Sequence, residues 1–236
     1  MNNLAIIIPT LNERENIGEI IERISATLES ASFEIVVVDD NSSDGTADIA
    51  ERYAETHGNI KVLRRKGKLG LASAVLDGIN ISDASTIGVI DADLQEPPET
   101  LPRLMAKIED GYDIVIGSRY VKGSSIEGWG LIRKFISKVA IWMAWLLLPS
   151  TRGIHDPSNG YFLVRRQVLN SDLDPKGFKI LMEILVKCRY QKVVEVPIDY
   201  VGRVRGESKL TSHQVVTHLK YLNKLRKDPR NRQPRE

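Results

Sequence analysis

Short apolar runs alternate with amphipathic segments through the first half of the chain. Runs dominated by Ile, Val and Leu are typical of strands buried on both faces; they occur at 4–8, 34–38, 61–63, 86–90 and 113–116. Segments with apolar residues at every third or fourth position predict helices. The first predicted helix begins at Asn12, which would cap it, and the second begins at Ser43. Two more are predicted at 71–79 and 98–108. The alternation predicts an α/β fold, in which a parallel sheet carries helices on both faces.

The half of the chain after Arg119 is less regular. Its patterns predict helices at 131–148, 177–190 and 211–226, and strands at 160–164 and 192–197. No Gly- or Ser-rich linker divides the chain, so we predict a single domain over 1–226. The polar residues 227–236 are predicted to form a basic, disordered tail.

Charged side chains collect where the predicted strands of the first half end. They are Glu13, Asp39, Asp40, Asp91, Asp93 and Arg119. Parallel strands place their carboxyl ends at one edge of the sheet, where ligands of such folds bind. We therefore expect these side chains to line one crevice.

The segment Asp91-Ala92-Asp93 is the most informative of these features, because it stands directly after the apolar run 87–90. Two carboxylates, with Gln95 as a third oxygen donor, suit Mg²⁺ or Mn²⁺, and such an ion usually serves a phosphate. Taken alone, two acids at a strand end could equally be solvated turn residues.

Charge is unevenly spread over the 236 residues, although the net charge is only +2. From Arg203 to Glu236 there are ten Lys or Arg against three Asp or Glu, a charge of +7 that leaves −5 for the rest. A basic end on an acidic body favours an anionic partner: a nucleic acid, an anionic membrane or a nucleotide.

The single cysteine and the lengths of the apolar segments indicate which cellular compartment suits the protein. The single cysteine, Cys188, excludes an internal disulfide, suits a reducing compartment and is predicted to be a buried structural thiol. No signal peptide is predicted before the first strand. The most apolar stretch, 139–149, has eleven residues, whereas a bilayer-spanning helix needs roughly 20.

The predicted helix 131–148 combines basic residues with aromatic and aliphatic ones. Arg133 and Ser137 are four residues apart and so share a face. Lys134 and Lys138 add positive charge, and Trp142, Trp145 and three leucines follow. This profile indicates a helix lying in a bilayer interface; an ordinary core helix is the alternative.

Two common nucleotide-binding fingerprints are missing from the sequence. Gly67-Lys68-Leu69-Gly70 matches neither the dinucleotide-binding pattern nor the P-loop pattern. A nucleotide would therefore be held by acids on its base or ribose and by a metal on its diphosphate.

Several segments carry a resemblance to a known family. PTLNE (9–13), DDNSSDGT (39–46), KLGL (68–71) and DADLQ (91–95) resemble family 2 glycosyltransferases with the GT-A fold. A narrower resemblance, to the dolichol (polyprenol) phosphate mannose synthases, rests on GSRY (117–120), GFKI (177–180), EVPI (195–198) and the R-x-x-G-x-S-K-L segment at 203–210. It extends to about Leu222.

The resemblance implies a role for each matching residue. The metal ligands would be Asp91, Asp93 and Gln95. The nucleotide pocket would comprise Pro9, Leu11, Glu13, Val38, Asp40 and Ala92. The phosphates and sugar would be surrounded by Arg119, Lys179, Arg203 and Lys209, and the acceptor phosphate bound by Arg133 and Ser137. A helix-capping turn is the alternative role for Asp40.

One segment departs from the family pattern. Residues 156–161 read DPSNGY where a D-x-x-S-G-F-like segment is usual, so Asn159 takes the serine position. We expect Asp156 to orient the acceptor loop, and His155 to be either structural or functional. Many family members also carry C-terminal transmembrane helices, and none is expected in this sequence.

The resemblance implies transfer of mannose from GDP-mannose to dolichyl (polyprenyl) phosphate with inversion, using Mg²⁺ or Mn²⁺. Residues 1–118 would bind the nucleotide and 119–226 the acceptor. The protein would lie peripherally on the cytoplasmic face of a membrane, with a separate anchoring protein as an open question and no nucleic-acid partner. The alternatives are another donor such as UDP-glucose, a metal-dependent nucleotidyltransferase, and a nonenzymatic membrane- or nucleic-acid-binding module.

Overall fold

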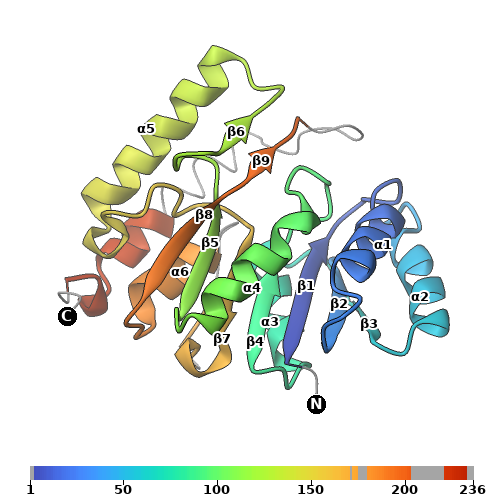
Figure 1. Ribbon diagram of the computed structural model, residues 1–236. Coiled ribbons are helices and arrows are strands. Elements are labelled where there is room, and N and C mark those ends of the chain that lie inside the picture. The colour runs from blue at the N-terminus through green and yellow to red at the C-terminus, as the bar shows by residue number, and fades with distance from the viewer. Residues whose placement is uncertain (1–2, 171, 175–179, 203–220, 233–236) are drawn as a thin grey trace.

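The computed structural model describes residues 3–170, 172–174, 180–202 and 221–232. A seven-stranded sheet lies at its centre, in the order β3-β2-β1-β4-β7-β5-β8 (Figure 1). The strands are β1 (Leu4–Thr10), β2 (Phe33–Asp39), β3 (Ile60–Arg64), β4 (Thr86–Val89), β5 (Ile114–Ser118), β7 (Phe162–Arg165) and β8 (Val193–Pro197). All neighbouring pairs are parallel except those that β7 makes with β4 and β5. The predicted α/β fold with a mostly parallel sheet is confirmed.

Helices cover both faces of the sheet (Figure 1). One face carries α1 (Ile17–Thr27), α2 (Thr46–Thr56) and α4 (Leu101–Glu109), and the other carries α3 (Leu71–Asn80) and α6 (Ile180–Lys187). Alternate residues of a strand point to opposite faces. In β1, Leu4, Ile6 and Ile8 therefore pack with the first group, and Ala5 and Ile7 with the second. Burial on both faces explains why the strand reads as a continuous apolar run.

A smaller sheet and a long helix extend the fold beyond β5 and β8. β6 (Ser125–Ile126) pairs with β9 (Asp199–Tyr200), and α5 (Leu131–Leu147) follows β6. Only Ile141 and Ala144 of α5 are buried, so the alternative of an ordinary core helix is not supported. The exposed apolar side chains of α5 are Leu131, Ile132, Phe135, Ile136, Val139, Trp142 and Leu146. Among the described residues, no helix has both the length and the apolarity needed to cross a bilayer.

The first two helices begin later than predicted. Asn12 has a left-handed backbone (φ 51°) and does not cap α1; its Oδ1 accepts from the Ser43 N–H at 3.0 Å, and its own N–H donates to Ser42. It therefore ties the loop after β1 to the loop after β2. α2 begins at Thr46 rather than Ser43, because Asp44 accepts from the Thr46 N–H and closes a turn before the helix.

The end of the chain also differs from the prediction. Residues 221–226 are helical, while 211–220 of the expected helix lie outside the described residues. The prediction of a disordered tail does not hold for 227–232, because Pro229–Arg232 form a 3₁₀ turn and Asn231 is 2% exposed. Further 3₁₀ turns lie at Pro98–Thr100, Pro149–Thr151 and Arg166–Val168.

The cysteine has the environment that was predicted. Cys188 follows α6 directly and is buried in the core on the α3 and α6 face of the sheet. Burial raises the pKa of its thiol, as expected for an inert structural cysteine.

Candidate active site

The acids predicted to share a crevice do follow strands that end at the same edge. β1, β2 and β4 are mutually parallel, and β5 has the same direction because β7 is antiparallel to both β4 and β5. A narrow pocket opens at this edge, with Pro9 from β1 and Asp91 after β4 in its wall. Gly160, Ile180 and Leu181 also line this pocket.

The acid pair and Gln95 lie in one tight turn. Leu94 has a left-handed backbone (φ 60°), and the Gln95 N–H donates to Asp93 Oδ1 at 3.2 Å. The Gln95 side chain donates to the carbonyl of Val201 at 3.2 Å, and the Val201 N–H donates to the carbonyl of Gln95 at 3.0 Å. Asp93 and Gln95 are buried, whereas Asp91 is partly exposed at the pocket. The turn is therefore fixed by Val201, the residue directly after β9.

The donor set of this turn fits a hard divalent cation. Two carboxylates and an amide oxygen are ligands of the type that Mg²⁺ and Mn²⁺ prefer, with room for substrate oxygens. The chain also leaves space for the Asp91 carboxylate, because a Cβ on Gly160 would stand 2.8 Å from Asp91 Oδ2. In the described ranges, no three His, Cys, Asp or Glu side chains gather closely enough to hold a metal by themselves. A cation here would need Gln95 or a ligand to complete its shell.

Asp40 is buried and organises the loop before α3. Its carboxylate accepts from the Arg65 guanidinium at 2.7 Å and from the N–H groups of Leu69 and Gly70 at 2.9 Å each. The turn after β2 is instead made by Asp39, whose Oδ2 accepts from the Ser42 N–H at 2.9 Å. The capping-turn alternative for Asp40 is therefore wrong, because Asp40 positions the loop 65–70 at the edge of the sheet.

The other predicted pocket residues differ in how far they are exposed. Glu13 is buried, where its N–H donates to Thr46 Oγ1 and its carboxylate accepts from Asn16. Leu11 is half-buried at the end of β1. Val38 and Ala92 lie in the hydrophobic core and do not line the crevice surface.

Arg119 is held by a buried carboxylate. Its Nε and Nη2 each donate to Asp156 at 2.8 Å, and its backbone N–H donates to Asp156 at 3.1 Å. The side chains are 11% and 0% exposed. Burial alone would lower the pKa of Arg119, but Asp156 outweighs it and raises the pKa above its ordinary value. The guanidinium is therefore permanently charged and fixed in orientation.

Aromatic rings connect Arg119 to α5. The Arg119 Cζ lies 5.3 Å from the ring centres of both Trp129 and Tyr200, and the Arg133 Cζ lies 4.3 Å from the Trp129 ring. Trp129 and Tyr200 meet edge-to-face at 5.3 Å. Burial raises the pKa of Tyr200, and the negative charges of Glu96 and Asp93 raise it further. The indole N–H of Trp129 is buried without a hydrogen-bond partner among the described residues.

The second predicted acceptor residue is also brought to this group. The Tyr120 hydroxyl donates to Ser137 Oγ at 2.7 Å, which ties the residue after Arg119 to the α5 face that carries Arg133. The structure therefore brings Arg119, predicted to contact the phosphates and sugar, close to Arg133 and Ser137, predicted to bind the acceptor phosphate.

The segment that departs from the family pattern supports this arrangement. Asn159 is buried; its side-chain amide donates to the carbonyl of Gly117 at the end of β5, and its Oδ1 accepts from the Gly160 N–H. Asp156 orients Arg119, as described above. His155 is exposed and contacts Glu195, whose carboxylate accepts from the His155 and Asp156 N–H groups. Lys179, Arg203 and Lys209 lie outside the described residues.

The sequence profile described as "Glycosyl transferase family 2" matches residues 5–172 of this chain. The chain belongs to this family.

Curated relatives of this family 2 glycosyltransferase narrow the comparison. A dolichol-phosphate mannosyltransferase of Pyrococcus furiosus is 47% identical over 95% of this chain, and the match spans 64% of that relative's length. A dolichol-phosphate mannosyltransferase of Saccharomyces cerevisiae is 32% identical over 94% of this chain and 86% of its own length. The similarity to dolichol phosphate mannose synthases that the motifs indicated is confirmed.

Solved structures agree on the fold. Glucosyl-3-phosphoglycerate synthase from Mycobacterium tuberculosis, crystallised with Mn²⁺, UDP-glucose and phosphoglyceric acid, superposes with a TM-score of 0.69. The match has 18% sequence identity and covers 95% of this chain and 79% of that one. This confirms the GT-A fold of the family 2 glycosyltransferase.

Sequence reasoning missed several residues of the candidate site. Trp129 and Tyr200 were not predicted, although the Gly-Trp-Gly segment directly before an exposed helix is an unusual local signal. Gly160 and Arg65 were also missed, since only their three-dimensional neighbours, Asp91 and Asp40, reveal their roles.

Proposed function

We propose that this chain transfers mannose from GDP-mannose to dolichyl (polyprenyl) phosphate, with inversion at the anomeric carbon. Support comes from relatives named dolichol-phosphate mannosyltransferase that align over nearly the whole chain. The structural observation that carries the proposal is the group in which Trp129 contacts both Arg119 and Arg133 beside the acid-bearing turn.

The arrangement suits two anionic substrates that react with each other. A nucleotide sugar and a lipid phosphate repel, so the site must offset negative charge at two neighbouring places. Arg119, fixed by Asp156, would face the donor, and Arg133 with Ser137 would face the acceptor phosphate. Lys179, Arg203 and Lys209 remain proposed as further phosphate contacts on the resemblance of their motifs.

On the donor side, Asp91, Asp93 and Gln95 would hold Mg²⁺ or Mn²⁺. When bound, such an ion neutralises charge that develops on the departing diphosphate. Arg119 contributes in the same direction, because a fixed guanidinium stabilises that charge without reorganising during the reaction. Asp40, Glu13, Pro9 and Leu11 are proposed to bound the nucleotide.

On the acceptor side, no strong general base is required. The nucleophile is a phosphate oxygen that is already anionic, so the residues have to align it rather than deprotonate it. Arg133 is suited to that task because a guanidinium can grip a phosphate through two donors at once. Alignment of two bound reactants can supply several kcal/mol of the barrier reduction, roughly 7–11 in the best cases.

We propose that α5 lies on a membrane and brings the site to its lipid acceptor. Seven large apolar side chains of α5 are exposed, and Arg133, Lys134 and Lys138 lie on the same helix. An apolar face with flanking cations is typical of interfacial helices, and each cation near an anionic leaflet adds about 1 kcal/mol of attraction. We assign the cytoplasmic face, where the nucleotide sugar is expected.

The alternative functions are less well supported. A UDP-glucose donor or nucleotidyl transfer would not be expected from relatives named for mannosyl transfer to dolichol phosphate. A nonenzymatic binding module leaves the acid-bearing turn and the Arg119–Asp156 pair without a role.

The test is transfer of label from each sugar nucleotide into the organic phase. The purified protein is incubated with polyprenyl phosphate and radiolabelled GDP-mannose or UDP-glucose, with and without Mn²⁺. We expect metal-dependent transfer from GDP-mannose, and a loss of at least about 100-fold in Asp93→Asn. The matched control is Asp110→Asn, because Asp110 is exposed at the end of α4, where it pairs with Lys107. Full activity of Asp93→Asn, or preference for UDP-glucose, would contradict the proposal.

A further inference from the structure

The last described segment of the chain lies between α5 and α6. We call residues 221–232 the C-terminal clamp. Tyr221, Leu222 and Leu225 of the clamp are buried in a cluster that also contains Ala144 and Leu148 beside the end of α5, and Met182 and Val186 of α6. Figure 1 shows this red segment beside both helices. One short segment therefore contacts the proposed membrane helix and a helix of the active-site wall.

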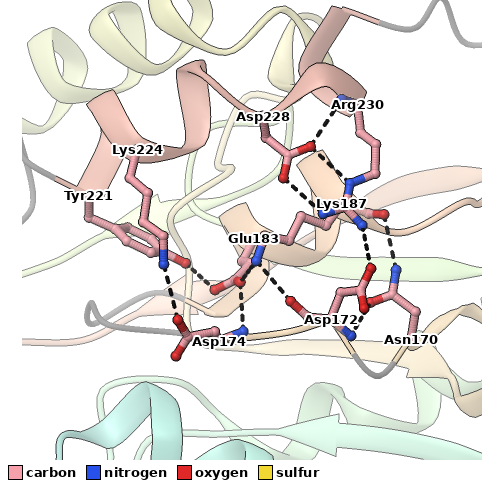
Figure 2. Close-up of polar contacts among 9 residues, drawn as sticks. All are labelled: Asn170, Asp172, Asp174, Glu183, Lys187, Tyr221, Lys224, Asp228 and Arg230. Atoms are coloured by element: carbon pink, nitrogen blue, oxygen red, sulfur yellow. Dashed lines mark hydrogen bonds and ion pairs between the residues drawn. The ribbon is translucent and has the colours of Figure 1, made fainter.

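The polar side of the clamp centres on Glu183 of α6, which is 0% exposed. Its Oε2 accepts from the Tyr221 hydroxyl at 2.5 Å, and its Oε1 accepts from the Asp174 N–H at 2.9 Å and from the ammonium of Lys187 (Figure 2). Lys187 also donates to the carbonyl of Asp172 at 2.9 Å. Both carboxylate oxygens of Glu183 are thereby satisfied by three different parts of the chain.

Weaker contacts surround this centre and extend to α5. Lys224 pairs with Asp174, and Arg230 pairs with Asp172, each at 3.1 Å and each more exposed than the Glu183 group. At the other end of the clamp, the Asn231 side chain donates to the carbonyl of Leu147, the last residue of α5, at 3.1 Å. The clamp thus satisfies a carbonyl that the helix itself leaves without a partner.

The first turn of α6, which contains Glu183, reaches the candidate active site. Ile180 and Leu181, in its first turn, line the pocket beside Asp91 and Gly160. α6 has eight residues, so it is about 12 Å long, and Glu183 follows Leu181 by only two positions. Contacts that fix Glu183 and Lys187 therefore also fix the wall of the pocket.

We propose that Glu183 and Tyr221 are positioning residues, and that the C-terminal clamp uses them to hold the first turn of α6 against the donor pocket. This inference rests on the proposed function. A buried ion pair adds little net stability compared with apolar side chains of similar volume. The Glu183 group therefore contributes chiefly by fixing the rotation of α6, which apolar packing alone would leave less defined.

The test compares Tyr221→Phe and Glu183→Gln with matched controls. Tyr112→Phe serves the first, because Tyr112 is a partly buried tyrosine that packs on the other face of the sheet from α6. Glu109→Gln serves the second, because Glu109 is exposed at the end of α4. Steady-state kinetics with GDP-mannose are measured well below the unfolding temperature of every variant, and amide hydrogen exchange is measured over 180–187.

We expect both variants to exchange faster at Ile184 and Leu185, whose N–H groups face the carbonyls of Ile180 and Leu181 in the first turn of α6. We also expect both to lose about tenfold in kcat/KM, with both controls close to the wild type. Unchanged exchange in α6 would overturn the inference. So would faster exchange with kcat/KM within about twofold of the controls, because the contacts would then be merely structural. If the wild-type protein transfers no mannose, the proposed function fails, and exchange at Ile184 and Leu185 alone decides whether the clamp holds α6.

Discussion

Gly160 offers a sharp test of the acid-bearing turn, because it separates activity from stability. A Cβ at this position would stand 2.8 Å from Asp91 Oδ2 and 3.1 Å from its Cγ. The φ of Gly160 lies outside the left-handed region, so alanine fits the backbone. The effect of Gly160→Ala must therefore arise from the contact with Asp91.

The size of the effect follows from these distances. Ordinary van der Waals contact begins at 3.4 Å, so the Asp91 carboxylate has to move by about 0.6 Å. Functional groups need placement to within about 0.5 Å, and a 1 Å error can cost on the order of 100-fold in rate. We expect Gly160→Ala to lower kcat by about tenfold and to weaken the response to Mn²⁺. Stability should change by less than about 1 kcal/mol, because alanine also restricts the unfolded chain.

The assay is mannosyl transfer at a series of Mn²⁺ concentrations, together with urea unfolding of the same preparations. Gly58→Ala is the matched control, because nothing lies within 4 Å of a Cβ at Gly58 and its φ is also not left-handed. Raising Mn²⁺ should restore part of the lost rate in Gly160→Ala alone. Equal rates for the two variants at every Mn²⁺ concentration would refute the argument that Asp91 needs this space.

Two further predictions address the arginine pair and the exposed helix. Asp156→Asn should reduce the free energy of unfolding by about 3 kcal/mol and abolish most transfer, because it leaves the Arg119 charge buried without its counterion; urea unfolding and the transfer assay measure both, and an unaltered unfolding curve would contradict it. The double variant Ile132→Ser/Phe135→Ser should bind anionic vesicles more than about tenfold more weakly with an unchanged unfolding temperature, since both side chains are exposed on α5. Ile81→Ser, at an exposed apolar residue after α3, is the control for co-sedimentation, and equal binding by both variants would count against a membrane-facing α5.

Local pattern was enough to predict the strands and most helices. Leu4–Thr10 and Phe33–Asp39 are buried along their whole length, so their apolar runs identify them without any knowledge of their neighbours. The same reasoning placed Asp91 and Asp93 at the edge of the sheet where the parallel strands end, because both follow a buried strand. Helix starts were less predictable, since Asn12 has the residue type of a cap but bonds to the loop after β2 instead.

The links between the site residues could not be predicted, because they join distant parts of the chain. Asp40 bonds to the N–H of Gly70, which is 30 positions away, and Arg119 pairs with Asp156 across 37 positions. Arg133 is only four positions from Trp129, but nothing local to Trp129 indicates that it will also meet Arg119. Likewise, the polar composition of 227–232 suggested disorder, and the order of this segment is explained by its contacts with the distant residues Leu147, Ser150 and Asp172.

The aromatic contacts give the two arginines different electrostatic environments. Like charges repel, so two guanidinium groups near one ring need compensation. Asp156 supplies a full counter-charge to Arg119. In the part of the chain that the structure describes, no acid forms an ion pair with Arg133, and the Trp129 ring, 4.3 Å away, offers only its electron-rich face. Arg119 is therefore held in place before any substrate arrives. The positive charge of Arg133 is compensated much less, so it can attract an incoming anion. This asymmetry matches a donor site that must be rigid and an acceptor site that must capture a phosphate from a membrane surface.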